Sequence, residues 1–150
     1  MMKKFLSLSF LMSLSGALCA AHVGLSPVKV SNAQVVTKTT PEIVMLNTQV
    51  LPENVKYNIS CPVSAEAGSG GVYFSFEAQN LGPQHSVSLT RGQVSSFIQQ
   101  GQIYDIPEQN STLEFYNVVM NGGYSFFQLN NRDGQHALDV GVCVATPVVS

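Results

Sequence analysis

Two cysteines far apart in the sequence, Cys61 in YNISCPV and Cys143 in GVCVATPVVS, raise the first question of chemistry. A structural zinc site needs four ligands, usually in close cysteine or histidine pairs, and no such pair occurs after residue 21. A catalytic cysteine needs a histidine beside it in the fold and a lowered pKa. In a compartment that oxidises thiols, two cysteines allow a single intramolecular pairing. We therefore expect a Cys61–Cys143 disulfide.

The titratable residues do not match a known catalytic arrangement. Asp133, His136 and Asp139 are close together in NNRDGQHALD, but no Gly-x-Ser-x-Gly turn supplies a nucleophilic serine. We interpret Asp133 as a turn residue, and His136 and Asp139 as solvated strand residues. Glu108 and Glu114 flank a loop without a sign that they converge, as glycoside chemistry would require. The sequence therefore predicts no catalytic residue, and a hydrolase of unrecognised type is only a third hypothesis.

We expect no cofactor, and the alternative is a copper-binding site. If cleavage after Ala21 makes His22 the first residue, its α-amine and imidazole could both bind copper(II). The segments AHVGLSPV and DGQHALDVGV resemble periplasmic copper-binding proteins of the small β-barrel type, which combine an N-terminal histidine with a late Asp-x-His. In this sequence Asp133 and His136 are one residue too far apart for that motif. The resemblance implies His22, Asp133 and His136 as metal ligands.

The start of the chain has the pattern of a secretory signal peptide. Lys3 and Lys4 precede the uncharged apolar stretch 5–18. Cleavage is possible after Cys19, Ala20 or Ala21, and the small residues Cys19 and Ala21 fit the signal-peptidase pockets best when cleavage follows Ala21. The stretch is shorter than the ~20 apolar residues of a membrane anchor. Lipidation at Cys19 is an alternative that Leu18, a large residue at that place, disfavours. We expect residues 1–21 to be removed and the protein to be secreted or periplasmic, with no membrane contact afterwards.

The composition describes one exported domain with few charges. Residues 22–150 suffice for a single core. Seven basic and nine acidic residues give the full chain a formal charge of −2. Because no basic stripe is available to neutralise phosphates, nucleic acid is excluded as a partner.

The first function hypothesis is a non-enzymatic binding or structural module that recognises a protein or a glycan. An enzyme inhibitor and an assembly subunit also belong to this class. Tyr104, Tyr116 and Tyr124 are candidate contact residues, although a tyrosine in a strand more often packs with its hydroxyl at the rim.

Alternation of apolar and polar residues recurs along the chain and predicts an all-β fold. VKYNISC, GVYFSFEAQN, SVSLT and TLEFYNVVM each show this period of two. RGQVSSFIQQG fits a short helix or a strand equally well. We expect a small antiparallel β-sandwich or barrel-like domain with one disulfide, in which residues 22–33 form a loose arm or an edge strand.

Turn residues divide the last part of the chain into three strands. MNGGY and NNRDGQ contain Asn-Gly and Asp-Gly pairs, which tolerate positive φ. We expect residues 112–145 to form a three-stranded antiparallel meander, with Gly122 or Gly123 at positive φ. In HALDVGVCVAT, regular alternation would place Cys143 on the face opposite Leu138 and Val140. We favour a β-bulge at Gly141, which would return Cys143 to the core.

Overall fold

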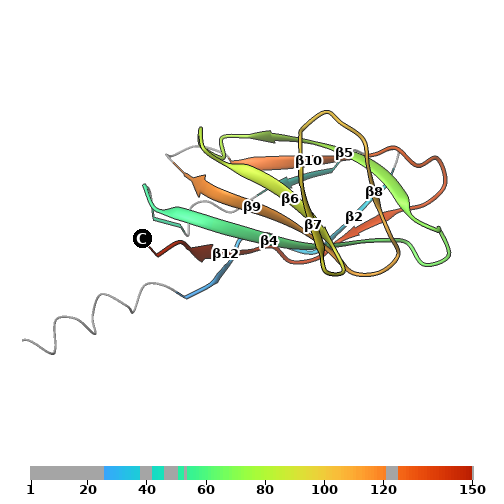
Figure 1. Cartoon of the computed structure of the whole chain (residues 1–150), viewed down its shortest axis with the longest axis horizontal. Coiled ribbons are helices and arrows are strands. Elements are labelled where there is room, and N and C mark those ends of the chain that lie inside the picture. The colour runs from blue at the N-terminus through green and yellow to red at the C-terminus, as the bar shows by residue number, and fades with distance from the viewer. Residues whose placement is uncertain (1–25, 38–41, 46–50, 53, 121–124, 150) are drawn as a thin grey trace, which may run out of the picture.

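The chain folds into two antiparallel sheets that enclose one hydrophobic core (Figure 1). The computed structural model describes residues 26–37, 42–45, 51–52, 54–120 and 125–149. The strands are β1 (Val28–Lys29), β2 (Gln34–Val36), β3 (Glu42–Met45), β4 (Lys56–Ala65), β5 (Val72–Gln79), β6 (Ser86–Arg91), β7 (Val94–Ile98), β8 (Tyr104–Ile106), β9 (Ser111–Val119), β10 (Phe126–Asn131), β11 (Leu138–Val140) and β12 (Val144–Pro147). The described residues include no helix of the length and apolarity needed to span a membrane.

The larger sheet has eight strands in the order β1-β12-β4-β9-β6-β7, with β11 also beside β4 and β2 beside β11. The smaller sheet has the order β3-β10-β5-β8. Alternating side chains of β4 are buried, as the period of two predicts, and in β5 the predicted core residues Val72, Phe74 and Phe76 are buried together with Ser75. Phe115 of β9 and Phe127 of β10 meet between the sheets, with ring centroids 4.7 Å apart. The expected β-sandwich is therefore confirmed.

The expected C-terminal meander is wrong. β9 pairs with β4 and β6, β10 pairs with β3 and β5, and β11 pairs with β2 and β4. The alternation shows which face of a strand is buried but not which strand lies beside it. β9 belongs to the larger sheet and β10 to the smaller one. Their apolar faces pack against each other across the core. The turn at Gly122 and Gly123 lies outside the described residues.

Two ambiguous segments are strands. Residues 94–98 form β7, which pairs with β6 through a two-residue loop in which Gly92 has φ 61°. Val28–Lys29, from the segment expected to be an arm or an edge strand, pairs with β12 at the end of the larger sheet. The N–H of Val30 continues this contact by donating to the carbonyl of Cys143 at 2.9 Å. The described part of that segment is thus an edge strand.

The bulge favoured at Gly141 is present. Val140 pairs with Val63 and Val144 pairs with Ser60, so three residues on one side oppose two on the other. The Gly141 N–H donates to the Pro62 carbonyl at 2.7 Å, and a Cβ at Gly141 would lie 3.1 Å from the Pro62 Cβ. The extra residue shifts the alternation, and Cys143 is buried together with Val140.

Candidate functional site

The two cysteines form the expected disulfide. Cys61 of β4 is bonded to Cys143, which lies in the bulge between β11 and β12. Both residues are fully buried. The Cys143 N–H donates to the Ser31 hydroxyl at 3.1 Å, so the N-terminal segment also packs against this point. Because disulfide sulfurs do not ionise, neither cysteine can act as a thiolate nucleophile or metal ligand here.

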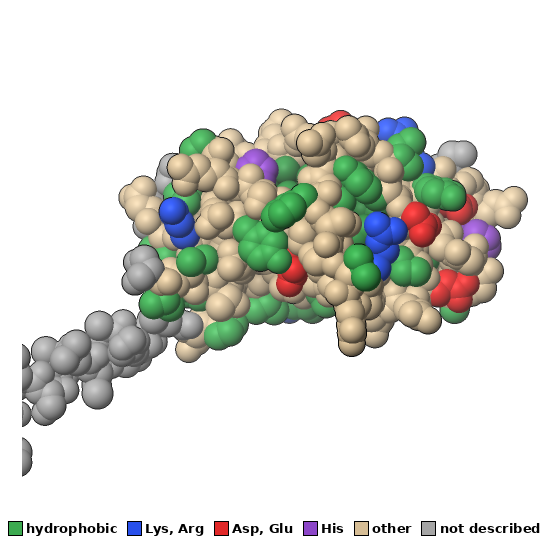
Figure 2. Space-filling view, in the orientation of Figure 1, with side chains coloured by type: hydrophobic (Ala, Val, Ile, Leu, Met, Phe, Trp, Pro, Cys, Tyr) green, Lys and Arg blue, Asp and Glu red, His purple; other side chains and the backbone are tan. Residues whose placement is uncertain are grey.

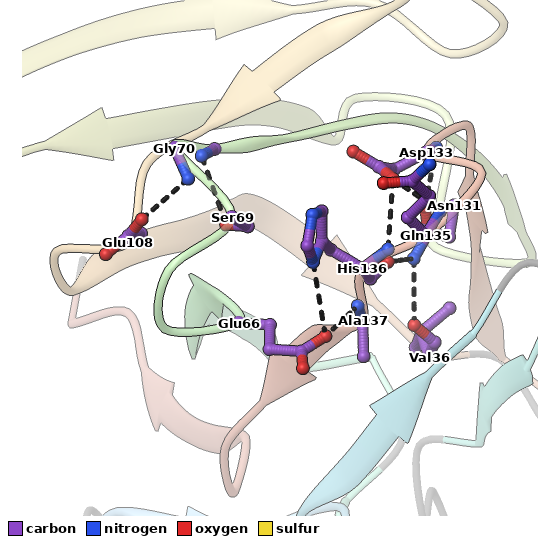
Figure 3. Close-up of polar contacts among 11 residues, drawn as sticks. Val36, Glu66, Ser69, Gly70, Glu108, Asn131, Asp133, Gln135, His136 and Ala137 are labelled. Atoms are coloured by element: carbon purple, nitrogen blue, oxygen red, sulfur yellow. Dashed lines mark hydrogen bonds and ion pairs between the residues drawn. The ribbon is translucent and has the colours of Figure 1, made fainter.

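Asp133 and His136 lie in the connection between β10 and β11 and have structural partners (Figure 3). One Asp133 carboxylate oxygen accepts hydrogen bonds from the backbone N–H groups of Gln135, at 2.7 Å, and His136, at 3.0 Å. The His136 Nδ1 lies 3.8 Å from Glu66 Oε2. Asp133 is therefore the turn residue that the sequence predicts.

The copper alternative stays a prediction. His22 lies outside the described residues. Within the described ranges, no group of three or more histidine, cysteine, aspartate or glutamate residues could hold a metal ion.

Glu108 fixes the glycine-rich connection between β4 and β5. Its Oε1 accepts a hydrogen bond from the Gly70 N–H at 2.6 Å (Figure 3). Hydrogen bonds from the backbone of Gly70 and Gly68 lower the pKa of the Glu108 carboxyl below its usual range. The side chain thus holds the loop at Gly70 in place.

The outward side of β6, β7 and β9 is the strongest candidate for a binding surface, and we name it the β6–β7–β9 face. Strand pairing places its residues in rows across the three strands. It consists of Ser86, Ser88, Thr90, Ser95, Phe97, Thr112, Glu114 and Tyr116. Glu114 is the one charged residue among these eight, and most of the others carry a hydroxyl group. Figure 2 shows that few of the visible side chains on this view of the molecule are charged and that several acidic ones lie toward one end.

Glu114 is oriented by two hydroxyl groups on this face. The Tyr116 hydroxyl donates to Glu114 Oε2 at 2.6 Å, and the Thr90 hydroxyl donates to the same oxygen at 3.5 Å. The hydrogen bond to Glu114 raises the pKa of Tyr116 above its usual range. Glu114 and Tyr116 are both half-buried. The carboxylate is therefore held in one orientation while its surroundings stay open to solvent.

Phe97 adds an exposed aromatic ring two strands away from this carboxylate, on the same face. It lies opposite Ser88, and Ser88 in turn lies opposite Glu114, so the three residues form one row. Phe97 is 76% exposed, whereas Ser88 is only 2% exposed. Adjacent strands are ~4.8 Å apart, so Phe97 and Glu114 are separated by about two strand spacings. An aromatic surface and a fixed carboxylate are thus within reach of one small ligand.

A shallow hollow continues the outer face on the other side of β9. It has a volume of about 390 Å³, and its lining includes Val35, Pro62, Ser64 and Asp139. Pro62 pairs with Thr112, which belongs to the β6–β7–β9 face. The hollow and the face are therefore neighbouring parts of one side of the larger sheet.

Part of this surface could be found from the sequence. Tyr116 is a predicted contact residue, and alternation in TLEFYNVVM places it on the same side as Glu114. Tyr104 has another role: its hydroxyl accepts a hydrogen bond from the Gln99 N–H at 2.7 Å, and its ring packs against the core. Tyr124 lies outside the described residues. Phe97 was missed because only strand pairing brings it into one row with Glu114.

Tyr116→Phe should lower the free energy of unfolding by about 1 kcal/mol at neutral pH, because one charge-assisted hydrogen bond at a half-buried site is lost. The raised pKa of Tyr116 means that the folded state favours the protonated hydroxyl. This contribution is complete below the unfolded-state pKa of about 10 and is lost as the pH rises through the higher folded-state pKa. Urea unfolding of both proteins between neutral and strongly alkaline pH measures the difference. Tyr73→Phe, at an exposed position on the smaller sheet, is the control. Equal stability of wild type and Tyr116→Phe at neutral pH would contradict this prediction.

Comparison with known proteins assigns no family. No protein-family model matches the chain, and no curated protein is similar to it in sequence. The CBM22-1 xylan-binding domain from Paenibacillus barcinonensis Xyn10C is 16% identical, with 83% of this chain and 87% of that chain covered and a TM-score of 0.43. The C-terminal family 22 carbohydrate binding module of Clostridium thermocellum Xyn10B is 12% identical, with 85% and 90% covered and a TM-score of 0.40. Identities and TM-scores this low assign neither a ligand nor binding residues to this chain.

Proposed function

We propose that this protein is an exported, non-enzymatic module that binds a carbohydrate on the β6–β7–β9 face. The observation that carries the proposal is the Glu114 carboxylate, which accepts a 2.6 Å hydrogen bond from Tyr116 on a hydroxyl-rich surface that also presents the exposed ring of Phe97 two strands away. Export is supported by the signal-like sequence 1–21 and by the disulfide, which persists in oxidising compartments.

The chemistry of this face suits a sugar ring. A pyranose has apolar C–H faces and hydroxyl groups around its edge, so it needs an aromatic surface and hydrogen-bonding groups at the same time. Phe97 supplies the aromatic surface. The Glu114 carboxylate can accept strong hydrogen bonds from sugar hydroxyls, and the serine and threonine hydroxyls can donate or accept. Because the one charge on the face is negative, we expect a neutral sugar and not an acidic one.

Binding without hydrolysis is supported by the distance between Glu114 and Asp139, a second carboxylate that strand pairing places on this side of the sheet among the described residues. Asp139 pairs with Ser64 and Glu114 pairs with Ser60, both on β4. Ser60 and Ser64 are four residues apart, which is about 13 Å along a strand. Catalytic carboxyl pairs of glycoside hydrolases are about 5–9.5 Å apart. Glu114 and Asp139 are therefore too far apart to act on one glycosidic bond.

Affinity gel electrophoresis against neutral soluble polysaccharides, including xylan, mannan, β-glucan and hydroxyethylcellulose, tests the proposal. We expect at least one polysaccharide to retard the wild type. Glu114→Gln keeps the size of the side chain but removes its charge, so retardation by that polysaccharide should fall about tenfold or more. Glu77→Gln changes an exposed glutamate on the outward side of the smaller sheet and is the matched control. Equal loss in both variants, or no retardation by any polysaccharide, would overturn the proposal.

A further inference from the structure

β7 has an unpaired and uncharged edge. It pairs with β6, and no other strand in the described parts of the chain lies along its second edge. The surrounding sequence, GQVSSFIQQG, contains no charged residue and no proline. Val94 is 70% exposed and Phe97 is 76% exposed, whereas Ile98 is buried. Proteins usually protect edge strands with charges, prolines or a covering segment, and β7 has none of these among the described residues.

The other described edge strands are shorter or contain a charge. β1 has two residues, one of them Lys29, and β8 has three residues with Asp105 at the centre. β2 has three residues, and the sequence of β3 begins with Glu42. β7 has five residues and no charge. It is therefore the described edge best suited to pair with another strand.

The hairpin geometry shows which backbone groups of β7 are available. Arg91 and Val94 close a two-residue loop, so they form a hydrogen-bonded pair, and hydrogen-bonded pairs alternate along an antiparallel ladder. Val94, Ser96 and Ile98 therefore direct their N–H and C=O groups toward β6. Ser95 and Phe97 direct theirs toward the open edge, where no described residue forms a backbone hydrogen bond with them.

We propose that β7 pairs with β7 of a second copy of this chain, antiparallel, around a two-fold axis at Ser96. Ser95 of each copy then lies opposite the partner's Phe97, and the two pairs form four backbone hydrogen bonds. Val94 lies opposite the partner's Ile98. The two Phe97 side chains are diagonal neighbours on one face, a spacing of ~7–8 Å that aromatic rings can bridge.

A second copy of the chain is the partner that suits this edge best, because two antiparallel copies of β7 are complementary to each other. In the register centred on Ser96, each exposed apolar side chain of β7 has an apolar side chain of the partner opposite or diagonal to it. No like charges meet, because the stretch from Gly92 to Gly101 is neutral. The interface is small, so we expect a weak dimer with a dissociation constant in the micromolar range.

This dimer goes beyond the proposed function and does not depend on it. A two-fold axis perpendicular to the sheet keeps both β6–β7–β9 faces on the same side of one continuous sheet. If that face binds sugar, the dimer presents two sites to one polysaccharide and gains avidity.

Sedimentation velocity on the oxidised mature protein, from low micromolar to near millimolar concentration, tests the proposal. We expect a concentration-dependent monomer–dimer equilibrium. Ser96→Lys and Ser96→Glu each place like charges opposite each other at the axis, so each should weaken the dimer about tenfold or more. An equimolar mixture of the two variants should restore it, because lysine then faces glutamate. Ser86→Lys, on β6 away from the edge, is the control and should leave the equilibrium unchanged.

Ser96 is exposed, so both variants should fold, and thermal unfolding checks this. A wild type that stays monomeric throughout would overturn the proposal. A dimer that is indifferent to the Ser96 variants, or a mixture that does not associate, would also overturn it. Sedimentation needs no sugar, so its result is independent of the polysaccharide experiment.

Discussion

Replacing both Cys61 and Cys143 with alanine should lower the free energy of unfolding by about 4.5 kcal/mol. The disulfide joins residues 82 positions apart, and closing a loop of that length restricts the unfolded chain by this amount on the chain-entropy model. Both residues are fully buried, and Cys61 belongs to β4, which pairs with β9, β11 and β12. Because a small domain is stabilised by only ~5–15 kcal/mol, much of the net stability depends on this one bond.

Urea unfolding of the oxidised wild type and the double variant measures this loss. Val142→Ala is the matched control, because Val142 precedes Cys143 but is 37% exposed, and we expect a change of about 0.5 kcal/mol or less. If the double variant lost less than about 1 kcal/mol, the disulfide would not have the role we assign to it.

Phe115→Ala should cost about 4 kcal/mol. Phe115 is fully buried in β9, and its ring centroid lies 4.7 Å from that of Phe127 in the opposite sheet. Removing the ring loses its transfer free energy and leaves a cavity between two sheets that cannot close over it completely. Guanidinium or urea unfolding at neutral pH gives the difference.

Phe97→Ala makes the same chemical change at an exposed position and is the control for Phe115→Ala. Phe97 is 76% exposed, so the free energy of unfolding should change by about 0.5 kcal/mol or less. The same variant should lose affinity for the polysaccharide, because the aromatic surface is gone. Equal destabilisation by the two substitutions would contradict both the packing of the core and the assignment of Phe97 to the surface.

The strands and their buried faces could be predicted from the sequence, but their neighbours could not. Val72, Phe74 and Phe76 alternate in the sequence and are buried in the structure. The same pattern in β9 and β10 does not tell whether two strands lie side by side or face to face, because both arrangements bury the same side chains. The packing of Phe115 against Phe127 decides this point, and it separates strands that the turn residues suggested would pair.

In the candidate site, too, the residues of one strand could be predicted from the sequence, whereas the residue from another strand could not. Glu114 and Tyr116 are two residues apart in a strand, so their common face follows from alternation alone. The bulge at Gly141 could also be inferred, since Cys143 would otherwise be on the wrong face for the disulfide. Phe97 joins Glu114 only through the register of β7 with β6 and of β6 with β9, which is set by tertiary structure.

The most direct test of the central claim is a map of amide chemical-shift changes by ¹H–¹⁵N NMR. The titrant is an oligosaccharide of the polysaccharide that retards the protein most. The account predicts that the largest changes fall on Ser88, Thr90, Phe97, Glu114 and Tyr116, and that Glu114→Gln needs about tenfold more oligosaccharide or more to reach them, while Glu77→Gln leaves the titration unchanged. Changes centred on the outward side of β5 and β10, with the β6–β7–β9 face unaffected, would contradict it.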